Sequence, residues 1–222
     1  MTKKNSSDTT TESTTQRTYF ALREAIITGE IPPGEKLKVE TLKTTLATGA
    51  SPLREALSLL TSDQLVERRD QRGFRVAVVS RKQFDEILNL RCKIEDLALR
   101  SSVAAGGQDW EDTLVLSHHH MLKAQSESLT EFETRHRAFH MALLAACDSP
   151  ILLRFCEQLY DLNIRYRYLA VKSEGYASRD IAGEHQDILD AAVKRDVEQS
   201  SSLLIAHYEK TGAYLSGLIE LT

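Results

Sequence analysis

The chain has 222 residues, of which 41% are hydrophobic and 27% charged, and its formal net charge is -4. This is the composition of an ordinary soluble protein of one or two domains, and a membrane-spanning protein is excluded because no apolar run approaches the roughly 18 residues that a membrane helix needs. The chain starts with a polar Ser/Thr tract instead of an apolar signal segment, so we expect a cytoplasmic protein.

Charge is distributed unevenly along the chain. Residues 17–80 carry ten Lys or Arg against eight Asp or Glu, whereas residues 81–222 carry sixteen against twenty-two. A mildly basic N-terminal part on an acidic C-terminal part predicts that only the first meets phosphate groups. Because non-specific affinity for nucleic acid scales with the number of phosphates neutralised, we expect that affinity to be modest.

The N-terminal part starts with a polar tail and two short predicted helices. Residues 1–16 have too little apolar content to fold, which predicts a disordered tail. Apolar side chains predict a first helix over residues 18–28, which Gly29 ends. Proline and glycine predict a turn at residues 31–34, and a second helix follows over residues 39–46.

A third helix, predicted over residues 51–62, has the features of a DNA-recognition helix. The Ser51 side chain can cap its N-terminus, with Pro52 at the first helical position, where an amide proton would have no partner. Arg54 then lies in the first turn, at the end of the helix that enters a DNA major groove most easily. Its guanidinium can bond bidentately to a guanine edge or clamp a phosphate, and Ser51 can contact the DNA backbone or a base.

A basic hairpin follows this helix. Residues 65–69 and 74–79 predict two strands joined by a tight turn. Arg72 at the tip would reach the flanking minor groove or a phosphate, and Gly73 permits the turn. Residues 17–80 therefore predict a winged helix-turn-helix domain that binds DNA.

The alternative for this N-terminal part is that its charges are only solvated. Arg54 would then pair with Glu55 or Glu24 at the surface, and the wing would be no more than a charged hairpin. The order of the elements, three helices and then a basic hairpin, favours DNA binding.

Residues 81–222 have a helical pattern without a strand signal. Apolar spacing predicts one long helix over residues 84–99, and about six helices in all, separated by breaks that include Gly106-Gly107, Ser149-Pro150 and the region around Gly175. We therefore expect a mainly α protein, in which the winged helix-turn-helix is followed by an all-α antiparallel bundle. Such bundles build ligand and metal sites from side chains that face one another across the core.

Four histidines of the C-terminal part are candidate metal ligands. His136 and His140 lie four residues apart, so both imidazoles would share one helical face and reach the same ion. His185 lies at the start of a later helix and His207 at the end of the next one, and a bundle could bring all four together. The alternative for each of them is a hydrogen-bonded core histidine.

The other histidines and the cysteines give no indication of a binding site. The run of histidines at residues 118–120 predicts a partly exposed helix face, because consecutive helical residues point about 100° apart and cannot converge on one ion. The cysteines, Cys92, Cys147 and Cys156, show no CxxC pairing and predict reduced, buried thiols.

Several sequence blocks resemble one family of bacterial transcription regulators. The blocks GEIPPGEKL at residues 29–37, PLREAL at residues 52–57 and GFRV at residues 73–76 are similar to the DNA-binding domain of the GntR family. The remainder resembles the all-helical FCD effector domain of its FadR subfamily. The resemblance implies a homodimer that binds a palindromic operator and releases it, or less often binds it more tightly, when a small carboxylate occupies the bundle near a divalent metal.

The resemblance also implies roles for individual residues. It implies DNA contact by Ser51, Arg54, Arg72 and Gly73, and metal contact by His140, His185 and His207. Arg91 and Glu95 match the family's Arg-x-x-x-Glu pattern in the first bundle helix. Arg91 is therefore a candidate for clamping the carboxylate of the effector, and a surface or structural salt bridge is the alternative.

The sequence departs from the family pattern at two places. His136 stands where the family has Asp, so the candidate ligands are all imidazoles, which favours zinc or nickel over magnesium or calcium. Alternatively, the metal has been lost and the histidines bind a carboxylate directly. Pro52 replaces the arginine that commonly follows the serine of the recognition helix, so one expected DNA contact is missing and the operator sequence cannot be inferred by analogy.

Within the family, these features also resemble a carbon-starvation regulator linked to glutarate catabolism, which implies a C4 to C5 dicarboxylate or hydroxy acid as the effector. A helical metalloenzyme is a competing class, but Arg137 stands where a zinc protease needs a glutamate, so we predict that the protein is not an enzyme. The third class considered is a constitutive DNA-binding dimer, whose bundle serves only for dimerisation. We predict a ligand-responsive repressor.

Overall fold

The computed structural model describes residues 13–171 and 180–219. Within them the chain divides into two compact units, one ending at Val78 and the other starting at Val79. The described part is mainly α-helical with one small sheet, which confirms the predicted fold class of a winged helix-turn-helix followed by a helical bundle. None of the described helices combines the length and the apolar character needed to cross a membrane.

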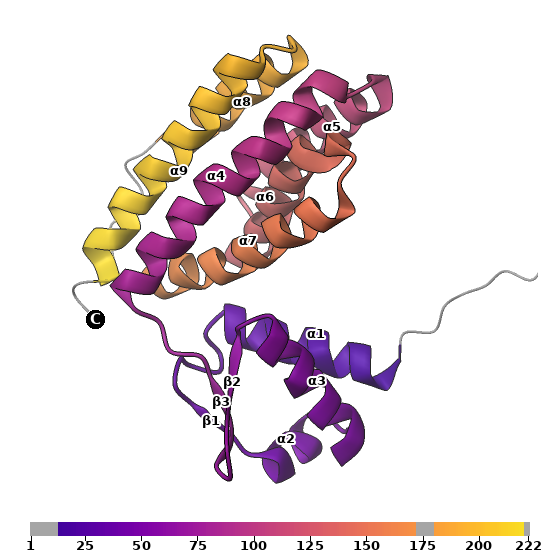
Figure 1. Cartoon of the computed structure of the whole chain (residues 1–222), viewed down its shortest axis with the longest axis vertical. Coiled ribbons are helices and arrows are strands. Elements are labelled where there is room, and N and C mark those ends of the chain that lie inside the picture. Colours follow the sequence, from indigo (N-terminus) through magenta and orange to yellow (C-terminus); the bar gives the residue numbers. More distant parts are fainter. Residues whose placement is uncertain (1–12, 172–179, 220–222) are drawn as a thin grey trace, which may run out of the picture. The chain divides into compact units, whose positions relative to one another are not determined.

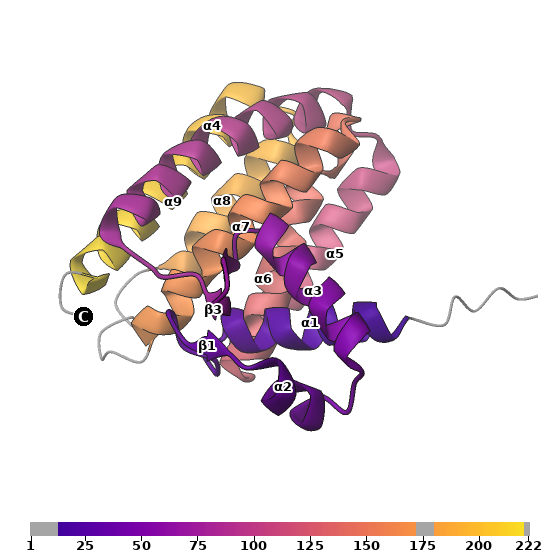
Figure 2. The same cartoon turned by 60° about the horizontal axis from the view of Figure 1, so that its bottom comes forward.

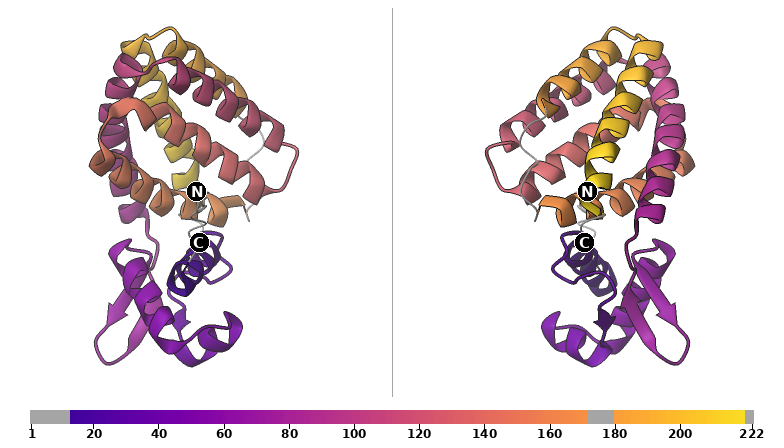
Figure 3. Two further views of the ribbon diagram at one scale, coloured as in Figure 1. Left: turned by 90° about the vertical axis from the view of Figure 1, so that its right-hand side faces the viewer. Right: turned by 90° about the vertical axis from the view of Figure 1, so that its left-hand side faces the viewer.

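The described part of the N-terminal unit contains helices and one three-stranded antiparallel sheet (Figure 1). Its elements are α1 (Thr14–Ile27), β1 (Lys36–Leu37), α2 (Val39–Thr45), α3 (Ala50–Ser62), β2 (Val66–Arg69) and β3 (Gly73–Val76). Strand β3 lies between β1 and β2, and the β2–β3 hairpin forms a projecting ribbon (Figure 3). Helices α2 and α3 are the helix-turn-helix, and the hairpin is its wing.

Helix α1 begins earlier than the sequence predicts. Ser13 is its N-cap: the Ser13 side-chain oxygen accepts a hydrogen bond from the Gln16 amide, and the Gln16 side chain accepts one from the Ser13 amide. This capping box satisfies two amide groups at the helix end and compensates for the low apolar content there. The expectation of a disordered tail is therefore wrong for residues 14–16, while residues 1–12 lie outside the described part.

Ser51 does not cap α3, contrary to the prediction. The helix begins at Ala50, and its N-cap is Gly49, which has an extended backbone (φ -78°, ψ 163°) and makes no side-chain hydrogen bond. The Leu53 amide donates to the Gly49 carbonyl at 3.2 Å. Pro52 is thus at the third helical position, where the amide also lacks an intrahelical partner, so proline fits there as well as at the first. The Ser51 side chain is left exposed.

The core of the N-terminal unit explains which face of α3 is available. Leu53, Leu57 and Leu60 are all fully buried and lie on one helical face. Helix α3 packs against α1, whose Leu22 and Ile26 are also buried. The opposite face of α3 therefore points to solvent.

Strand β1 was not predicted, because a strand of two residues carries no periodic signal. Its residues Lys36 and Leu37 pair with Arg75 and Phe74 of β3. Leu37 and Phe74 are buried. Since side chains alternate between the faces of a sheet, Lys36 and Arg75 lie opposite each other on the other face.

The C-terminal unit is an antiparallel helical bundle (Figures 1 and 2). Its elements are α4 (Arg81–Ala105), α5 (Gln108–Ala124), α6 (Leu129–Leu144), the 3-10 turn η1 (Ala145–Cys147), α7 (Pro150–Val171), α8 (Ile181–Val193) and α9 (Val197–Ile219). Helix α4 packs against α6, α7 and α9, and α8 packs against α5 and α9. The breaks predicted at Gly106-Gly107 and Ser149-Pro150 are found, and Gly175 lies outside the described residues. His207 lies inside α9 and not at a helix end as predicted.

An apolar core fills the space between these helices. Its fully buried members include Leu99, Leu114, Met121, Phe139 and Leu143. The three cysteines are free thiols. Cys156 is buried as predicted, whereas Cys92 and Cys147 are half-buried.

Gly106 ends α4 next to Trp110. An alanine Cβ at this position would lie 2.3 Å from Trp110 Cε3 and 2.9 Å from the Ser102 carbonyl oxygen, and the Trp110 indole is held by donating to the Ala142 carbonyl at 2.8 Å. We expect Gly106→Ala to lower the free energy of unfolding by about 1–3 kcal/mol, the usual cost of overpacking, in urea denaturation. Gly107→Ala is the matched control because its Cβ would meet nothing within 4 Å. Equal losses in both variants would contradict the prediction.

Candidate metal centre and nucleic-acid interface

The solvent-facing side of α3 carries the predicted DNA contacts Ser51 and Arg54, and both side chains are exposed. Among the described residues Arg54 makes no ion pair. Glu55 instead accepts a hydrogen bond from the Thr15 hydroxyl at 3.0 Å. The pairing of Arg54 with Glu55 or Glu24, which was the alternative, is therefore not found in the described part of the chain.

The tip of the wing carries Arg72 and Gly73, both exposed. The Arg72 amide donates to the Arg69 carbonyl at 3.0 Å and closes the turn. Gly73 has φ +83°, a left-handed conformation that strains any side chain, although a Cβ there would meet nothing within 4 Å. The backbone conformation, and not lack of space, therefore requires glycine at this position.

Further cations join Arg72 around a shallow depression of about 120 Å³ on the wing. The depression is lined by Lys36, Arg69, Arg72, Gly73, Phe74 and Arg75. Lys36 stands directly opposite Arg75 across β1 and β3, and like charges in this arrangement are destabilising. Arg69 is paired with Glu67 at 3.1 Å. The sequence placed Arg69 and Arg75 in the predicted basic hairpin without giving them a role, whereas Lys36 was missed because β1 was not predicted. A DNA phosphate is the kind of anion that such a surface binds.

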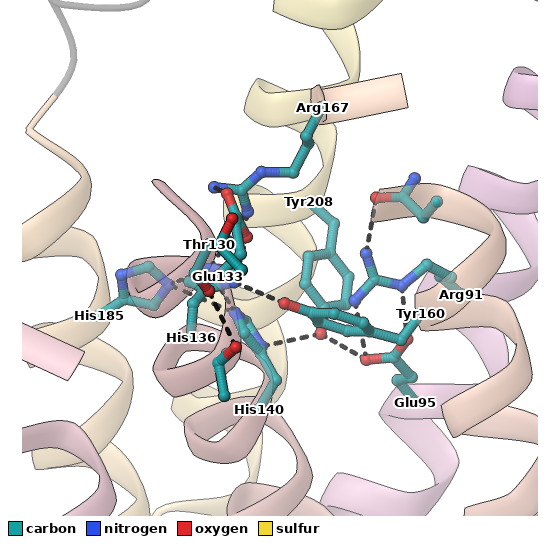
Figure 4. Close-up of polar contacts among 12 residues, drawn as sticks. Arg91, Glu95, Thr130, Glu133, His136, His140, Tyr160, Arg167, His185 and Tyr208 are labelled. Atoms are coloured by element: carbon teal, nitrogen blue, oxygen red, sulfur yellow. Dashed lines mark hydrogen bonds and ion pairs between the residues drawn. The ribbon is translucent and has the colours of Figure 1, made fainter. Parts of the chain in front are cut away.

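The four histidines predicted as metal ligands converge inside the bundle. His136 and His140 come from α6, His185 from α8 and His207 from α9, and none is more than 4% exposed. One ring nitrogen of each lies within 4.8 Å of one nitrogen of every other ring. Figure 4 shows the first three pointing toward one another. Tertiary packing thus brings together residues from three helices.

Three of the ring nitrogens approach closely enough to share one ion. Nε2 of His136 lies 3.1 Å from Nε2 of both His140 and His185, and the last two atoms are 3.3 Å apart. Burial, and then the positive charge of neighbouring groups, lowers the pKa of these three rings well below the ordinary value, so the rings are neutral near pH 7. Four nitrogens at about 2.0–2.1 Å from a tetrahedral zinc ion are about 3.3–3.4 Å apart. The neutral donor set and its spacing therefore fit a metal ion.

Polar partners hold the outer nitrogens of three rings. The partner atoms are the Glu184 carboxylate, 2.7 Å from His207 Nδ1, the Tyr160 hydroxyl, 2.7 Å from His136 Nδ1, and the Tyr208 hydroxyl, 3.1 Å from His140 Nδ1. Such partners orient histidine ligands and set their tautomers in metal sites.

The predicted effector residues Arg91 and Glu95 form a buried ion pair beside the histidines. Arg91 donates to both Glu95 carboxylate oxygens, at 2.6 and 3.2 Å, and to the Asn163 side-chain oxygen at 3.0 Å. Burial alone would lower the pKa of Arg91, but Glu95 together with Tyr208 and Tyr160 more than offsets this and raises it, so Arg91 stays charged. Because Arg91 is 5% exposed and Glu95 0%, a surface salt bridge is excluded, and the structural salt bridge that was the other form of the alternative is found.

A second buried ion pair, between Arg167 of α7 and Glu133 of α6, also borders the cluster. Arg167 Nη2 lies 2.7 Å from Glu133 Oε1, and its Nη1 lies 3.3 Å from both ring nitrogens of His136. Burial raises the pKa of Glu133, and Arg167 opposes this effect. Sequence reasoning missed both residues. The one local signal was that Glu133 precedes His136 by three residues and so shares its helical face.

A cavity of about 10 Å³ lies between these groups. Its polar lining consists of Arg91, His136, Asn163, Arg167, His207, Tyr208 and Thr211. This volume holds about one water molecule, whereas ligand pockets measure about 300–1,000 Å³. A small-molecule ligand can therefore enter only if the surrounding side chains or helices move.

The three consecutive histidines at residues 118–120 lie apart from this group. His118 is buried against Phe139, with ring centroids 5.2 Å apart, while His119 and His120 are exposed. The predicted partly exposed face is therefore found, and His118 is its core-facing member.

Comparison with known proteins matches both units to described families. Residues 14–76 match "Bacterial regulatory proteins, gntR family", and residues 86–210 match the FCD domain. The HTH-type transcriptional repressor GlaR of Escherichia coli K12 is 34% identical over 197 residues, 85% of this chain and 90% of GlaR. The regulator BphR of Paraburkholderia xenovorans LB400 is 34% identical over 203 residues, 88% of this chain and 82% of BphR. The solved structure of E. coli McbR/YncC shares the fold, with a TM-score of 0.81 at 24% identity over 91% of this chain and 97% of that one.

Proposed function

The chain belongs to the GntR family of bacterial transcription regulators and carries an FCD effector domain, and we propose that it binds operator DNA as a homodimer. In this proposal the DNA is released when a small carboxylate occupies the bundle beside a divalent metal. The proposed binding of metal and carboxylate by the bundle rests on one observation, the convergence of four buried imidazoles. Its relatives are regulators and not enzymes, and GlaR is a repressor, which supports repression as the direction of control.

DNA binding is the role we propose for residues 17–80. Ser51 and Arg54 would enter the major groove, because both are exposed on the face of α3 that its core residues leave free. Arg72 and Gly73 at the wing tip would contact the flanking minor groove. The basic depression that includes Lys36 and Arg75 would hold a backbone phosphate, which also relieves the repulsion between these two cations.

Effector binding and dimerisation are the roles we propose for residues 81–222. Exposed apolar side chains support a homodimer: Leu90 and Leu97 of α4 are 40% and 58% exposed, and Ile151 and Phe155 of α7 are 74% and 53% exposed. Helices α4 and α7 pack against each other, so these side chains lie on neighbouring elements. Exposed apolar patches mark interaction surfaces, and a palindromic operator requires a two-fold partner.

The chemistry of the cluster favours zinc or nickel, because its donors are all neutral imidazoles. When bound, such an ion supplies positive charge for a carboxylate oxygen. Arg91 and Arg167, each neutralised by its own glutamate, could exchange that contact for a carboxylate of the effector. Two such arginines support a dicarboxylate such as glutarate as the ligand.

The small cavity supports release by a shift of population. A ligand that fits only an expanded arrangement of the bundle stabilises that arrangement. The segment around Ser80 would pass this change on as a different spacing of the two recognition helices in the dimer. Operator affinity would change only to the extent that the effector binds the two arrangements differently.

A metal-independent sensor is the second candidate. The contact of Arg167 Nη1 with His136 at 3.3 Å favours it, because a guanidinium beside the rings repels a metal cation and attracts an anion. The histidines would then bind the carboxylate directly. A constitutive DNA-binding dimer is the third, and it predicts no response to metal or carboxylate.

The test begins with metal analysis of protein purified without chelators, for which we expect a stoichiometric amount of zinc or nickel. Glutarate should then raise the melting temperature and weaken binding to an operator selected from a pool of random duplexes. His140→Ala should lose the metal, whereas His119→Ala, at an exposed position, should keep it. A glutarate response that persists in chelated protein supports the metal-independent sensor. Operator binding that no carboxylate changes contradicts the sensor altogether.

A further inference from the structure

A chain of buried hydrogen bonds links the histidine cluster to the Arg91–Glu95 ion pair. It runs from His140 Nδ1 to the Tyr208 hydroxyl at 3.1 Å, from that hydroxyl to Glu95 Oε2 at 2.5 Å, and from Glu95 to Arg91 (Figure 4). Its members come from α4, α6 and α9, and none is more than 5% exposed. These bonds are therefore shielded from bulk solvent.

The donor and acceptor groups determine the direction of every hydrogen bond in this series. The Arg91 guanidinium can only donate, so the Glu95 carboxylate accepts from it. The Tyr208 hydroxyl has a single proton and donates it to Glu95. A tyrosine hydroxyl keeps its proton near pH 7, so this proton stays on the Tyr208 oxygen. The Tyr208 oxygen can then only accept from His140, which places the proton of the neutral ring on Nδ1.

This tautomer decides what His140 presents to the other rings. With the proton on Nδ1, the Nε2 atom that faces His136 and His185 carries a lone pair. The opposite tautomer would point an N–H group into the cluster and block a metal there. For the Tyr160 hydroxyl, the described residues show a bond to His136 alone, so the direction of that bond is not set in the same way.

We propose that Tyr208 is a positioning residue that holds His140 as the Nδ1–H tautomer and thereby couples the histidine cluster to Arg91. A carboxylate that draws Arg91 away from Glu95 leaves more charge on Glu95, which strengthens its bond to Tyr208, and the Tyr208 oxygen then accepts more strongly from His140. His140 becomes a better metal ligand, and because coupling between binding sites is reciprocal, metal raises the affinity for the carboxylate. The coupling rests on the proposed function, whereas the tautomer does not.

The test compares the wild type with Tyr208→Phe, which removes the hydroxyl and keeps the buried ring. In metal-free protein, nitrogen NMR of isotope-labelled histidines should show the Nδ1–H tautomer of His140 in the wild type and its loss in the variant. In competition with a chelator, the variant should bind zinc about 10- to 100-fold more weakly, the usual effect of removing the partner behind a metal ligand. The gain in zinc affinity that saturating glutarate produces should shrink.

Tyr166→Phe is the matched control, because the Tyr166 hydroxyl is also buried but bonds to Ser80 and Gln83. Its His140 tautomer and zinc affinity should equal those of the wild type. An Nε2–H tautomer in the wild type, or an unchanged tautomer and zinc affinity in Tyr208→Phe, would overturn the proposal. If the wild type binds no zinc but the tautomer changes as expected, the positioning role stands and the proposed metal sensor fails.

Discussion

Replacing Arg54 by alanine is expected to weaken operator binding about 5- to 150-fold, which corresponds to the loss of one bidentate base contact. Arg54 is exposed on α3 and has no ion pair among the described residues, so the loss would come from the DNA interface. The free energy of unfolding should change by less than about 0.5 kcal/mol, because surface substitutions of this kind rarely cost more. Fluorescence anisotropy on the selected operator measures the first effect, and urea denaturation the second.

The control for this prediction is Arg68→Ala, at an exposed position on β2 that does not line the basic depression, and we expect a much smaller loss. Binding to a random-sequence duplex separates the two roles open to Arg54. If Arg54 contacts a base, Arg54→Ala lowers binding to the operator alone. If it contacts a phosphate, the variant binds both duplexes more weakly, and the slope of log affinity against log salt concentration falls by about one. Operator affinity unaffected by Arg54→Ala would remove this residue from the interface.

Acidification of the metal-free protein is expected to destabilise the bundle steeply as the pH falls below 6.5, the ordinary pKa of histidine. Burial holds the pKa of His136, His140 and His185 well below this value, so the unfolded chain takes up protons that the folded chain does not. Their stabilising contribution is complete above the ordinary pKa and is lost as the pH falls toward the folded values. Three rings give a slope of at most about 4 kcal/mol per pH unit. Glu133 opposes this trend, since burial raises its pKa, but it is a single group.

Urea denaturation at a series of pH values measures this slope. His140→Gln removes one titrating ring and should reduce the slope by about 1.4 kcal/mol per pH unit, whereas His119→Gln, at an exposed position, should leave it unchanged. Zinc should move the loss of stability to lower pH, because metal and protons compete for the same nitrogens. A flat stability profile from neutral to acid pH would contradict the presence of neutral, buried rings.

Most of the secondary structure could be predicted because its signals are local. Proline and glycine mark the turns, and apolar periodicity marks the helices, so the predicted second helix differs from α2 by one residue at its end. The errors concern the two-residue strand β1, which was missed, the end of a helix wrongly placed at His207, and the starts of two helices. The capping box at Ser13 extends α1 into residues expected to be disordered, and Gly49 replaces Ser51 as the cap of α3. Several residues near a helix start can satisfy the same free amides, so sequence alone does not select among them.

Only part of the candidate site could be predicted from the sequence. Spacing along one helix predicted that His136 and His140 share a face, and the expected bundle made His185 and His207 candidates. The resemblance to the family then implied metal contact by His140, His185 and His207. The structure adds Tyr208, Glu133 and Arg167, none of which was named beforehand. Arg167 could not be connected to His136 from the sequence, because the two residues lie on different helices, 31 positions apart.

The sequence by itself determined the elements, the helical face that carries Arg54 and the inventory of imidazoles, because each of these follows from residues within a turn or two of one another. Tertiary structure alone decided that rings from α6, α8 and α9 meet at one point, and that Tyr208 bonds to Glu95, which is 113 residues away. Such contacts depend on how helices pack and on which buried partner is left to accept each proton. No local pattern in the sequence encodes the packing of the helices or the choice of buried acceptor.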